Sequence, residues 1–295
     1  MAKQNQLQEK LDIYVLTMPE RTHLVRKLKN HLSTLNSNLD FHVVDAITPE
    51  HCSVDKSIDH IKNNRLKAIG HRQISKAEIA CSLGHLKMIE HFLLSSSRRA
   101  LFFEDDVVAK SNCFRKLAKI IPALPNNHTL FFGQSTLELF SIFKKIKIEE
   151  NEEIEFITNF TENAHAYLLD KIAARNIVQY ISKNLQNPFD VSLGRYWLTG
   201  SNVFLYNKRI FWQNKDLPSL LSRSKNGRRN PLTWSLFYRI AFLKQLPLGL
   251  SKLLKMLMKI YFSLIHLPFT LGAKIPPFLM ITDKYSPQQN PQTQR

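Results

Sequence analysis

The chain has 295 residues, of which 44% are hydrophobic and 22% are charged, and it carries a formal net charge of +17. The first two values are those of an ordinary globular protein that is long enough to bury a substantial core. Its three cysteines, Cys52, Cys81 and Cys113, form no CxxC pair. Their spacing excludes a zinc ribbon and a disulfide framework, and it suits a reducing compartment.

The first half of the chain alternates between strand and helix patterns. An apolar run at 13–17 is followed by Pro19, by leucines at helical spacing, and by a second apolar run at 41–46. Strand, helix and strand at this spacing predict a βαβ unit, so we expect an α/β domain with a parallel, doubly wound sheet. The polar span 51–72 has no firm period, and we expect a long excursion there.

Residues 75–95 carry the clearest helical pattern of the chain. Ser75 and Glu78 predict a capping box at its start. Glu78, Ser82 and His85 are spaced four and three residues apart, so they share one face of the helix. Capping alone accounts for Glu78, and a histidine in a helix is more often structural than catalytic. The spacing by itself therefore gives neither residue a chemical role.

The predicted helix leads into ALFFEDDVV at 100–108, an apolar strand that ends in Glu104, Asp105 and Asp106. Open α/β sheets bind ligands beyond the carboxyl ends of their strands. Adjacent carboxylates about 4 Å apart repel each other by on the order of 4 kcal/mol at an effective dielectric near 20. A divalent cation, Mg²⁺ or Mn²⁺, would relieve this repulsion and could hold a diphosphate. The triplet therefore predicts metal-assisted chemistry on a nucleotide-linked substrate, and the alternative is a surface turn or a helix N-cap cluster.

The middle of the chain supplies two further candidates. We expect strands at 128–133 and 164–169, followed by a helix that Asp170 caps. His165 lies in the second strand, where a buried imidazole costs free energy unless it is hydrogen-bonded. Asp190 is a lone acid after a predicted Asn-Pro turn and signals little by itself.

The charge is unevenly distributed along the chain. The acidic stretch 149–155 predicts a solvated loop or hairpin. The segment from Lys208 to Lys274 contains thirteen Lys and Arg residues and a single acid. After Pro247 the lysines recur at spacings of three and four with aliphatic residues on the other side, which predicts a basic amphipathic helix in a membrane interface.

The basic region is not predicted to span a membrane. Its longest uncharged run has about 14 residues, short of the roughly 20 that a spanning helix needs. A nucleic-acid surface is the alternative, but single-strand binders set aromatic residues beside basic grooves, whereas these lysines alternate with aliphatic residues. We expect one domain over 1–215 and a basic, helical, membrane-associating tail over 216–295 with a disordered end.

Taken together, these segments resemble glycosyltransferase family 25, the bacterial lipooligosaccharide galactosyltransferases that share a domain with collagen galactosyltransferases. The resemblance begins at IYVLTMPERTHLVRKL, which includes Arg21, and it is strongest over SKAEIACSLGHLKMIEHFL and ALFFEDDVV. It returns at ENAHAYLL and FDVSL, and it covers roughly 12–206. Ala77 and Ala80 replace glycines of the family's helix motif, and Gly84 stands where serine is usual.

The resemblance implies a GT-A-like, Rossmann-type domain with a mostly parallel sheet and flanking helices. It also implies an inverting hexosyltransferase, expected to be β-1,4-type with UDP-galactose as donor. A cation would neutralise the departing diphosphate, and a base from another segment would activate the acceptor hydroxyl. The implied roles are metal binding by Glu104 and Asp106, base catalysis by Asp190 or secondly Glu78, donor binding by Arg21, Asp45 and Asp105, and acceptor contact or structural support by His85 and His165.

The basic tail then has a rationale. A lipid-linked oligosaccharide acceptor of lipopolysaccharide type lies at the inner face of the bacterial cytoplasmic membrane, where anionic lipids attract each Lys or Arg by about 1 kcal/mol. We expect a cytoplasmic, peripheral enzyme with no nucleic-acid partner, because the first twelve residues lack the apolar core of a secretion signal. The rivals are a non-catalytic membrane- or nucleic-acid-binding α/β protein and a metal-dependent hydrolase. The chain shows no second His/Asp cluster of the kind that two-metal hydrolases need.

Overall fold

The computed structural model describes residues 10–63, 74–132, 140–157, 164–185, 188–194, 196–206 and 208–214. The predicted tail over 216–295 lies outside these residues. Among the helices of the described ranges, none combines the length and the apolar character that a membrane crossing requires.

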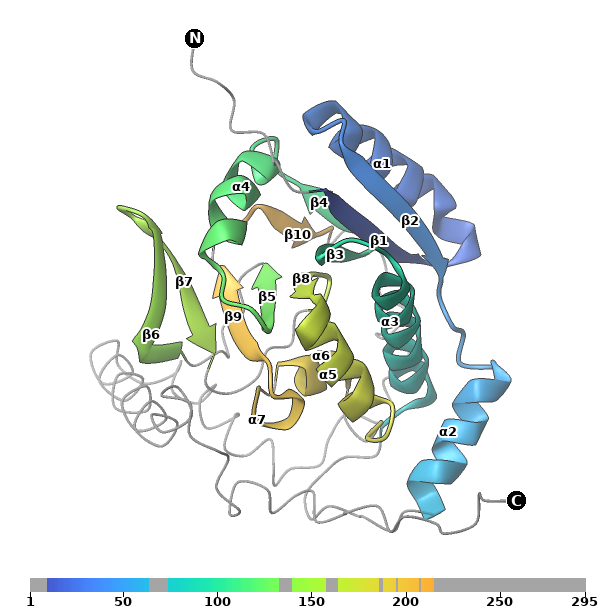
Figure 1. Cartoon of the computed structure of the whole chain (residues 1–295). Coiled ribbons are helices and arrows are strands. Elements are labelled where there is room, and N and C mark those ends of the chain that lie inside the picture. The colour runs from blue at the N-terminus through green and yellow to red at the C-terminus, as the bar shows by residue number, and fades with distance from the viewer. Residues whose placement is uncertain are drawn as a thin grey trace, which may run out of the picture.

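An eight-stranded sheet forms the centre of the molecule (Figure 1). Its order is β2 (Leu39–Asp45), β1 (Leu11–Thr17), β3 (Arg99–Glu104), β8 (Ala166–Asp170), β5 (His128–Phe132), β9 (Asn202–Tyr206), β7 (Glu152–Ile157) and β6 (Phe140–Glu149). Only β8 and β7 run against the other strands. The predicted α/β domain with a mostly parallel sheet is confirmed.

The sheet is mostly but not entirely parallel, and besides β7 the exception is β8. This strand lies between β3 and β5 and is antiparallel to both. All five of its residues are buried, and an apolar run that is covered on both faces has the same pattern in either direction. Its sequence therefore predicts the strand but not its orientation.

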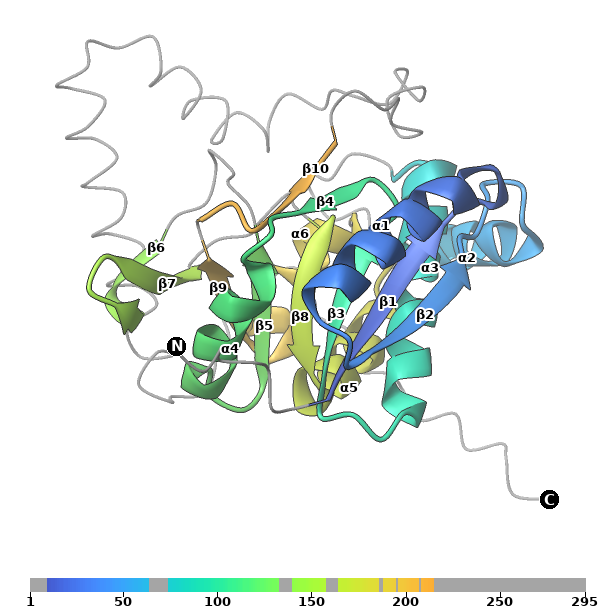
Figure 2. The same ribbon diagram turned by 90° about the horizontal axis from the view of Figure 1, so that it is seen from above.

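Helices cover both faces of the sheet (Figures 1 and 2). On one face, α1 (Thr22–Leu35) packs on β1 and β2 after the short turn η1 (Pro19–Arg21), and α4 (Cys113–Ala123) lies on the same side. On the other face, α3 (Lys76–Leu94) packs beside α5 (Lys171–Ile181), with α6 (Phe189–Leu193) and α7 (Tyr196–Thr199) next to α5. A separate ribbon of β4 (Val107–Ala109) and β10 (Phe211–Gln213) joins the end of the triplet to the segment after β9.

Helix starts follow the predicted capping residues. The Ser75 hydroxyl accepts a hydrogen bond from the Glu78 amide at 3.2 Å, and the Glu78 carboxylate accepts one from the Ser75 amide at 2.9 Å. Asp170 caps α5 by accepting from the Ala173 amide at 2.8 Å. Both caps satisfy amide donors that the first helical turn would otherwise leave unpaired.

The predicted excursion at 51–72 is wrong over its first part, because 52–63 form helix α2 (Cys52–Asn63). Val54 is fully buried in a small cluster with Ile74 and Ile79, and Ile58 packs against it. The helix is thus stabilised by contact with the start of α3. Val54, Ile58 and Ile61 are spaced four and three residues apart in the sequence, so a helical pattern is present within this otherwise polar span.

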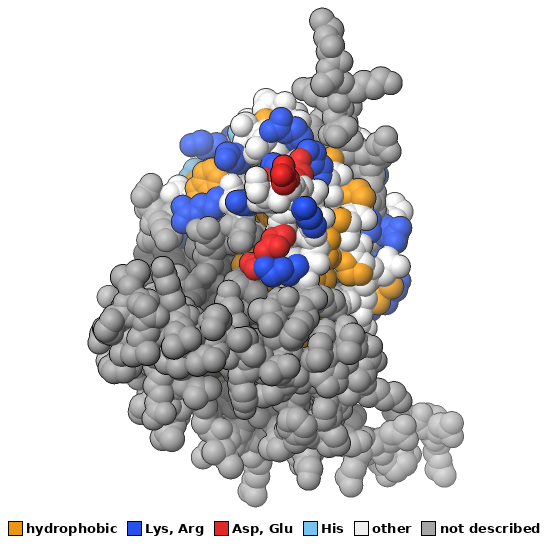
Figure 3. Space-filling view, turned by 90° about the vertical axis from the view of Figure 1, so that its left-hand side faces the viewer, with side chains coloured by type: hydrophobic (Ala, Val, Ile, Leu, Met, Phe, Trp, Pro, Cys, Tyr) orange, Lys and Arg blue, Asp and Glu red, His pale blue; other side chains and the backbone are white. Residues whose placement is uncertain are grey.

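The acidic stretch forms the turn of a hairpin between β6 and β7, one of the two predicted outcomes. Lys116 of α4 lies 2.8 Å from Glu149 and 2.6 Å from Glu152, and Lys119 also pairs with Glu149. In the view from the left-hand side of Figure 1, basic and acidic side chains are interspersed on the described surface (Figure 3). That part of the surface shows no large patch of one sign.

A row of aromatic rings crosses the centre of the sheet. Tyr14, Phe102 and Tyr167 are register partners on β1, β3 and β8. Their rings stack with centroid distances of 5.5 and 5.0 Å. Each such pair contributes about 0.5–1.5 kcal/mol beyond its buried area. The row also fixes the position of the Tyr167 hydroxyl, which lies beside a histidine described below.

Candidate active site

The acidic triplet lies at the edge of the sheet where the carboxyl ends of β1, β2 and β3 meet. Leu16 pairs with Glu104, and Thr17 pairs with Asp45. Because β8 is antiparallel to β3, its first end comes to the same edge, and the Glu104 amide donates to the carbonyl of His165 at 3.0 Å. One sheet edge therefore brings together residues that are far apart in the sequence.

Asp105 connects the triplet to the loop after β1. It is buried, and its carboxylate accepts from the Thr17 hydroxyl at 3.0 Å and from the Met18 amide at 3.4 Å. The guanidinium of Arg21 donates to its other oxygen at 3.3 Å. The contacts of Asp105 thus hold Arg21, the predicted phosphate-binding cation, next to the triplet.

Asp106 is bound on one side only. Its Oδ2 atom accepts from the side-chain amide of Gln213 at 3.0 Å, and its carbonyl accepts from the Asn214 amide at 2.8 Å. Its Oδ1 atom is buried and has no hydrogen-bond partner among the described residues. Burial and the charges of Glu104 and Asp105 raise the pKa of Asp106 to about 6. A cation at Oδ1 would offset both effects.

Glu104 is the most accessible member of the triplet, with 30% of its side chain exposed. Its Oε1 atom lies 3.5 Å from Nε2 of His85. Burial opposes the ionisation of Glu104, but His85, His165 and Arg21 together lower its pKa below the ordinary value. The carboxylate form is therefore favoured at neutral pH.

His85 is held on three sides. It is fully buried on α3, and its Nδ1 atom lies 3.0 Å from the Tyr167 hydroxyl. Its ring stacks on Phe189 of α6 with a centroid distance of 4.4 Å and an angle of 6°. These contacts direct Nε2 toward Glu104, so the predicted helix histidine is buried and lies against the triplet.

The two candidate bases, Asp190 and Glu78, both lie close enough to Cys81 to act on its charge. Burial of the Cys81 thiol is the main cause of its raised pKa, and the negative charges of Glu104, Asp190 and Glu78 raise this pKa further. Asp190 is the second residue of α6, directly after Phe189, whereas the Glu78 carboxylate accepts from both the amide and the hydroxyl of Ser75 at 2.9 Å. The Glu78 carboxylate thus takes part in the capping box.

The remaining predicted residues lie at the edges of this group. His165 is buried, and its Nε2 atom has no hydrogen-bond partner among the described residues. Burial lowers its pKa, although the charge of Glu104 opposes this, so the neutral imidazole is favoured. Asp45 is exposed at the end of β2, and its carbonyl accepts from Lys87 at 3.3 Å.

Sequence reasoning missed four residues of the site: Thr17, Tyr167, Phe189 and Gln213. Thr17 had a usable signal, because it is the polar residue that ends the first predicted strand. Tyr167 and Phe189 look like core residues in the sequence. Gln213 reaches Asp106, which lies 107 positions earlier in the sequence, only because β10 pairs with β4.

The donor set fits a hard divalent cation. Glu104 and Asp106 offer carboxylate oxygens, which Mg²⁺ and Mn²⁺ prefer. The Oδ1 atom of Asp106 has no partner among the described residues, and the pKa of this carboxyl is raised. A cation bound at Oδ1 would balance the negative charge of the carboxylate.

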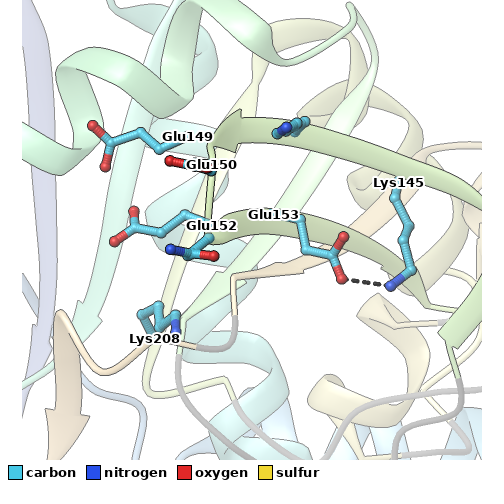
Figure 4. A pocket seen from close by; sticks show the side chains of 8 residues that line it. Lys145, Glu149, Glu150, Glu152, Glu153 and Lys208 are labelled. Atoms are coloured by element: carbon cyan, nitrogen blue, oxygen red, sulfur yellow. Dashed lines mark hydrogen bonds and ion pairs between the residues drawn. The ribbon is translucent and has the colours of Figure 1, made fainter.

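A cleft of about 400 Å³ opens elsewhere, at the turn between β6 and β7 (Figure 4). Lys145 is directed at Glu153 there. The residues lining it are Lys145, Lys147, Glu149, Glu150, Asn151, Glu152, Glu153 and Lys208. Several of these acids are already paired with lysines, and none is a predicted site residue.

The family comparison places this geometry in context. The family described as Glycosyltransferase family 25 (LPS biosynthesis protein) matches residues 11–193, more than half of the chain. No curated protein matches the chain.

Solved structures show only a distant likeness. One is a glycosyltransferase involved in the glycosylation of the major capsid of PBCV-1, with 13% identity, a TM-score of 0.37, and coverage of 67% of this chain and 81% of that one. The inositol-1-phosphate CTP transferase from T. maritima has 13% identity, a TM-score of 0.42, and coverage of 76% and 100%. The galactosyltransferase LgtC, in complex with donor and acceptor sugar analogs, has 13% identity, a TM-score of 0.36, and coverage of 66% and 73%. At these scores the likenesses carry no further argument.

Proposed function

We propose a specific reaction for this chain, which belongs to glycosyltransferase family 25. It is an inverting, metal-dependent hexosyltransferase of GT-A type that moves galactose from UDP-galactose, in a β-1,4 linkage, to a core sugar of lipooligosaccharide or lipopolysaccharide. The observation that carries the proposal is the buried, unpartnered Oδ1 atom of Asp106 beside Glu104 at the carboxyl edge of the sheet.

The triplet and its neighbours bind the donor. Glu104 and Asp106 would hold Mn²⁺ or Mg²⁺, which when bound supplies positive charge to the diphosphate of the donor. Arg21, held by Asp105 at 3.3 Å, adds a fixed cation at the same edge. Asp45, two strands from β3, is exposed at this edge and would contact the nucleoside.

Asp190 is the proposed base. It accepts the proton of the acceptor hydroxyl as that oxygen forms a bond to the anomeric carbon and the bond from this carbon to UDP breaks. Inversion requires the base and the leaving group on opposite faces of the sugar, and Asp190 comes from α6 rather than from the triplet. Glu78 is the second candidate, although its carboxylate takes part in the capping box of α3.

The two histidines support the site. His85 orients Glu104 through the contact of 3.5 Å, because Tyr167 and Phe189 fix its ring. His165, neutral and buried beside Glu104, would act as a further metal ligand or an acceptor contact.

Calorimetry of UDP binding to the full chain, with and without Mn²⁺, tests the metal-dependent donor site. Wild type should bind UDP at least tenfold more tightly with Mn²⁺, and Asp106→Asn should lose this gain. Asp40→Asn is a matched control, because Asp40 lies at the other end of β2 and pairs with Lys10. Equal binding of UDP with and without Mn²⁺ by wild type would refute the proposed cation site.

Product analysis tests the finer assignment. UDP-galactose should be consumed faster than UDP-glucose in the presence of a lipooligosaccharide core acceptor, and the new linkage should have the opposite anomeric configuration to the donor by NMR. Retention of configuration would contradict the role of Asp190. Release of free sugar without an acceptor would indicate a hydrolase.

We also place the chain on the cytoplasmic face of the bacterial membrane as a peripheral protein. The support is the excess of thirteen Lys and Arg over one acid between Lys208 and Lys274. Residues 1–215 would form the transferase domain, and 216–295 the part that contacts anionic lipid.

A further inference from the structure

Three different ligand types converge beside the triplet. One ligand atom each from Cys81, His85 and Glu104 lies within 4.8 Å of the other two. Cys81 and His85 are four residues apart on α3, so they project from the same face, and Glu104 ends β3. We propose that these side chains form a binding site for a thiophilic divalent cation of the zinc class, distinct in donor set from the oxygen pair of Glu104 and Asp106.

The chemistry of the three atoms suits zinc. Zn²⁺ binds cysteine sulfur, histidine nitrogen and carboxylate oxygen, and sites with three protein ligands leave a fourth position open. Bond lengths of about 2.0–2.3 Å place tetrahedral ligand atoms about 3.3–3.6 Å apart. His85 Nε2 and Glu104 Oε1 are already 3.5 Å apart. The sulfur lies within 4.8 Å of its two partners, so it would have to move closer by at most about 1.2 Å.

His85 is preorganised as a ligand. Its side chain is fully buried, and its Nε2 atom makes no hydrogen bond of ordinary geometry among the described residues, where Glu104 Oε1 lies 3.5 Å from it. Nδ1 is occupied by the Tyr167 hydroxyl at 3.0 Å, and Phe189 stacks on the ring. Metal-binding histidines usually make such a second contact through the nitrogen that does not bind the metal. The Nε2 atom of His85 is therefore held in a fixed orientation toward the other two ligands.

The local charge also favours a cation. The carboxylates of Glu104, Asp190 and Glu78 impose a negative potential at the sulfur of Cys81. A divalent cation would offset this potential, and its binding would release the thiol proton to solvent as the sulfur–metal bond forms.

The other described group of potential ligands is a weaker candidate. Asp12, Asp40 and His42 also lie close together, but Lys10 contacts Asp40 at 2.5 Å and already supplies a positive charge there. That group lies at the amino ends of β1 and β2 and contains no sulfur. The presence of sulfur therefore distinguishes the two groups in an experiment.

Binding at the thiolate site has one consequence that rests on the proposed function. Both cation sites use Glu104, so zinc at Cys81 and His85 would withdraw this carboxylate from the donor cation. Zinc would then weaken Mn²⁺-dependent UDP binding, whereas the thiolate site itself exists whether or not the chain binds UDP.

Spectroscopy with Co²⁺ tests the site directly. The metal-free full chain is titrated with Co²⁺ under a reductant that binds metals weakly. Wild type should develop the near-ultraviolet charge-transfer band of a cobalt thiolate and the visible bands of a four-coordinate ion, and Zn²⁺ should abolish both. Cys81→Ser should lose the thiolate band, and Glu104→Gln should keep it but bind at least tenfold more weakly.

The double variant C52S/C113S is the matched control, because it removes an exposed and a buried thiol away from the group and should keep the band. Absence of the band in wild type, or its survival in Cys81→Ser, would overturn the inference. If wild type shows no thiolate band but binds UDP with Mn²⁺, the zinc-class site fails and the proposed function stands. If the band appears without Mn²⁺-dependent UDP binding, the reverse holds.

Discussion

Asp106 is a carboxylate that the fold leaves half-satisfied. Gln213 and Asn214 bind one side of the residue, while Oδ1 is buried without a partner among the described residues. Natural sites keep such unfavourable groups when binding requires them. The unpaired charge should therefore reduce the stability of the metal-free protein.

Asp106→Asn should stabilise the metal-free chain at neutral pH. The folded-state pKa of about 6 exceeds the ordinary 3.8, so the folded chain binds more protons than the unfolded one between these values. Wild-type stability should thus fall as the pH rises from about 4 to 6 and stay low above it. Asparagine removes this loss, on the order of 3 kcal/mol, and still accepts from Gln213.

Urea denaturation of both proteins at pH 4 and pH 7.5, with a chelator present, checks this expectation. Added Mn²⁺ should then stabilise wild type and leave Asp106→Asn unchanged, because only a state that binds the ligand gains stability from it. A variant less stable than wild type at pH 7.5 would show that the charge of Asp106 is already compensated.

The two candidate bases can be separated by single substitutions. Asp190→Asn should lower kcat by about 10²–10⁴ with UDP affinity unchanged, because it removes the group that takes the hydroxyl proton. Glu78→Gln should leave kcat nearly unchanged and cost only a few tenths of a kcal/mol in stability, because glutamine at this position also completes a capping box. Steady-state kinetics with thermal denaturation of both variants decides between them. A larger loss of kcat in Glu78→Gln would assign the base to α3.

At the scale of elements, α3 carries much of the site. The capping box fixes its first turn, and its middle carries Cys81 and His85. The packing of α3 on β1 sets the distance of these two side chains from Glu104. Gly84 faces this strand, since an added Cβ would lie 3.1 Å from the Leu16 side chain. The serine usual in related sequences would thus require Leu16 to shift by a few tenths of an ångström.

Helix α2 depends on a contact with the start of α3. Val54→Ala should therefore destabilise α2, because it removes a fully buried side chain from the cluster with Ile74 and Ile79. Hydrogen exchange should rise by about tenfold in 52–63 and stay unchanged in β3, since α2 can open without the sheet.

Val43→Ala is the matched control, because Val43 is 51% exposed on β2. It should leave the exchange of α2 unchanged. Equal protection of α2 in wild type and Val54→Ala would show that the cluster does not stabilise this helix.

At the scale of the whole molecule, charge separates the chain into two parts. The described surface in Figure 3 carries both basic and acidic side chains. In the sequence between Lys208 and Lys274, by contrast, all charged residues but one are basic. Such a segment is attracted to anionic surfaces within a Debye length, about 8 Å at physiological salt.

Truncation after Lys225 should abolish binding to vesicles that contain anionic lipid and preserve activity on a short soluble acceptor. The reason is that the truncation removes the predicted amphipathic helix but leaves the residues that form the site. Co-sedimentation at low and high salt checks this, with neutral vesicles as the control. Retention of the truncated chain on anionic vesicles would contradict the assigned role of the tail.

Local chemistry made the central features predictable from the sequence. The βαβ start, the capped helix before ALFFEDDVV, and the acids at the end of that strand follow from periodicity and from short-range hydrogen bonding, which residues a few positions apart determine. The family resemblance carried in these motifs is confirmed over 11–193.

Only the tertiary structure decided the direction of β8 and the partners of each carboxylate. Two buried faces erase the pattern that would show strand direction. Contacts such as Gln213 with Asp106, or Tyr167 with His85, join residues more than 80 positions apart. Their geometry is set by sheet register and helix packing, and neither is encoded in any short window of sequence.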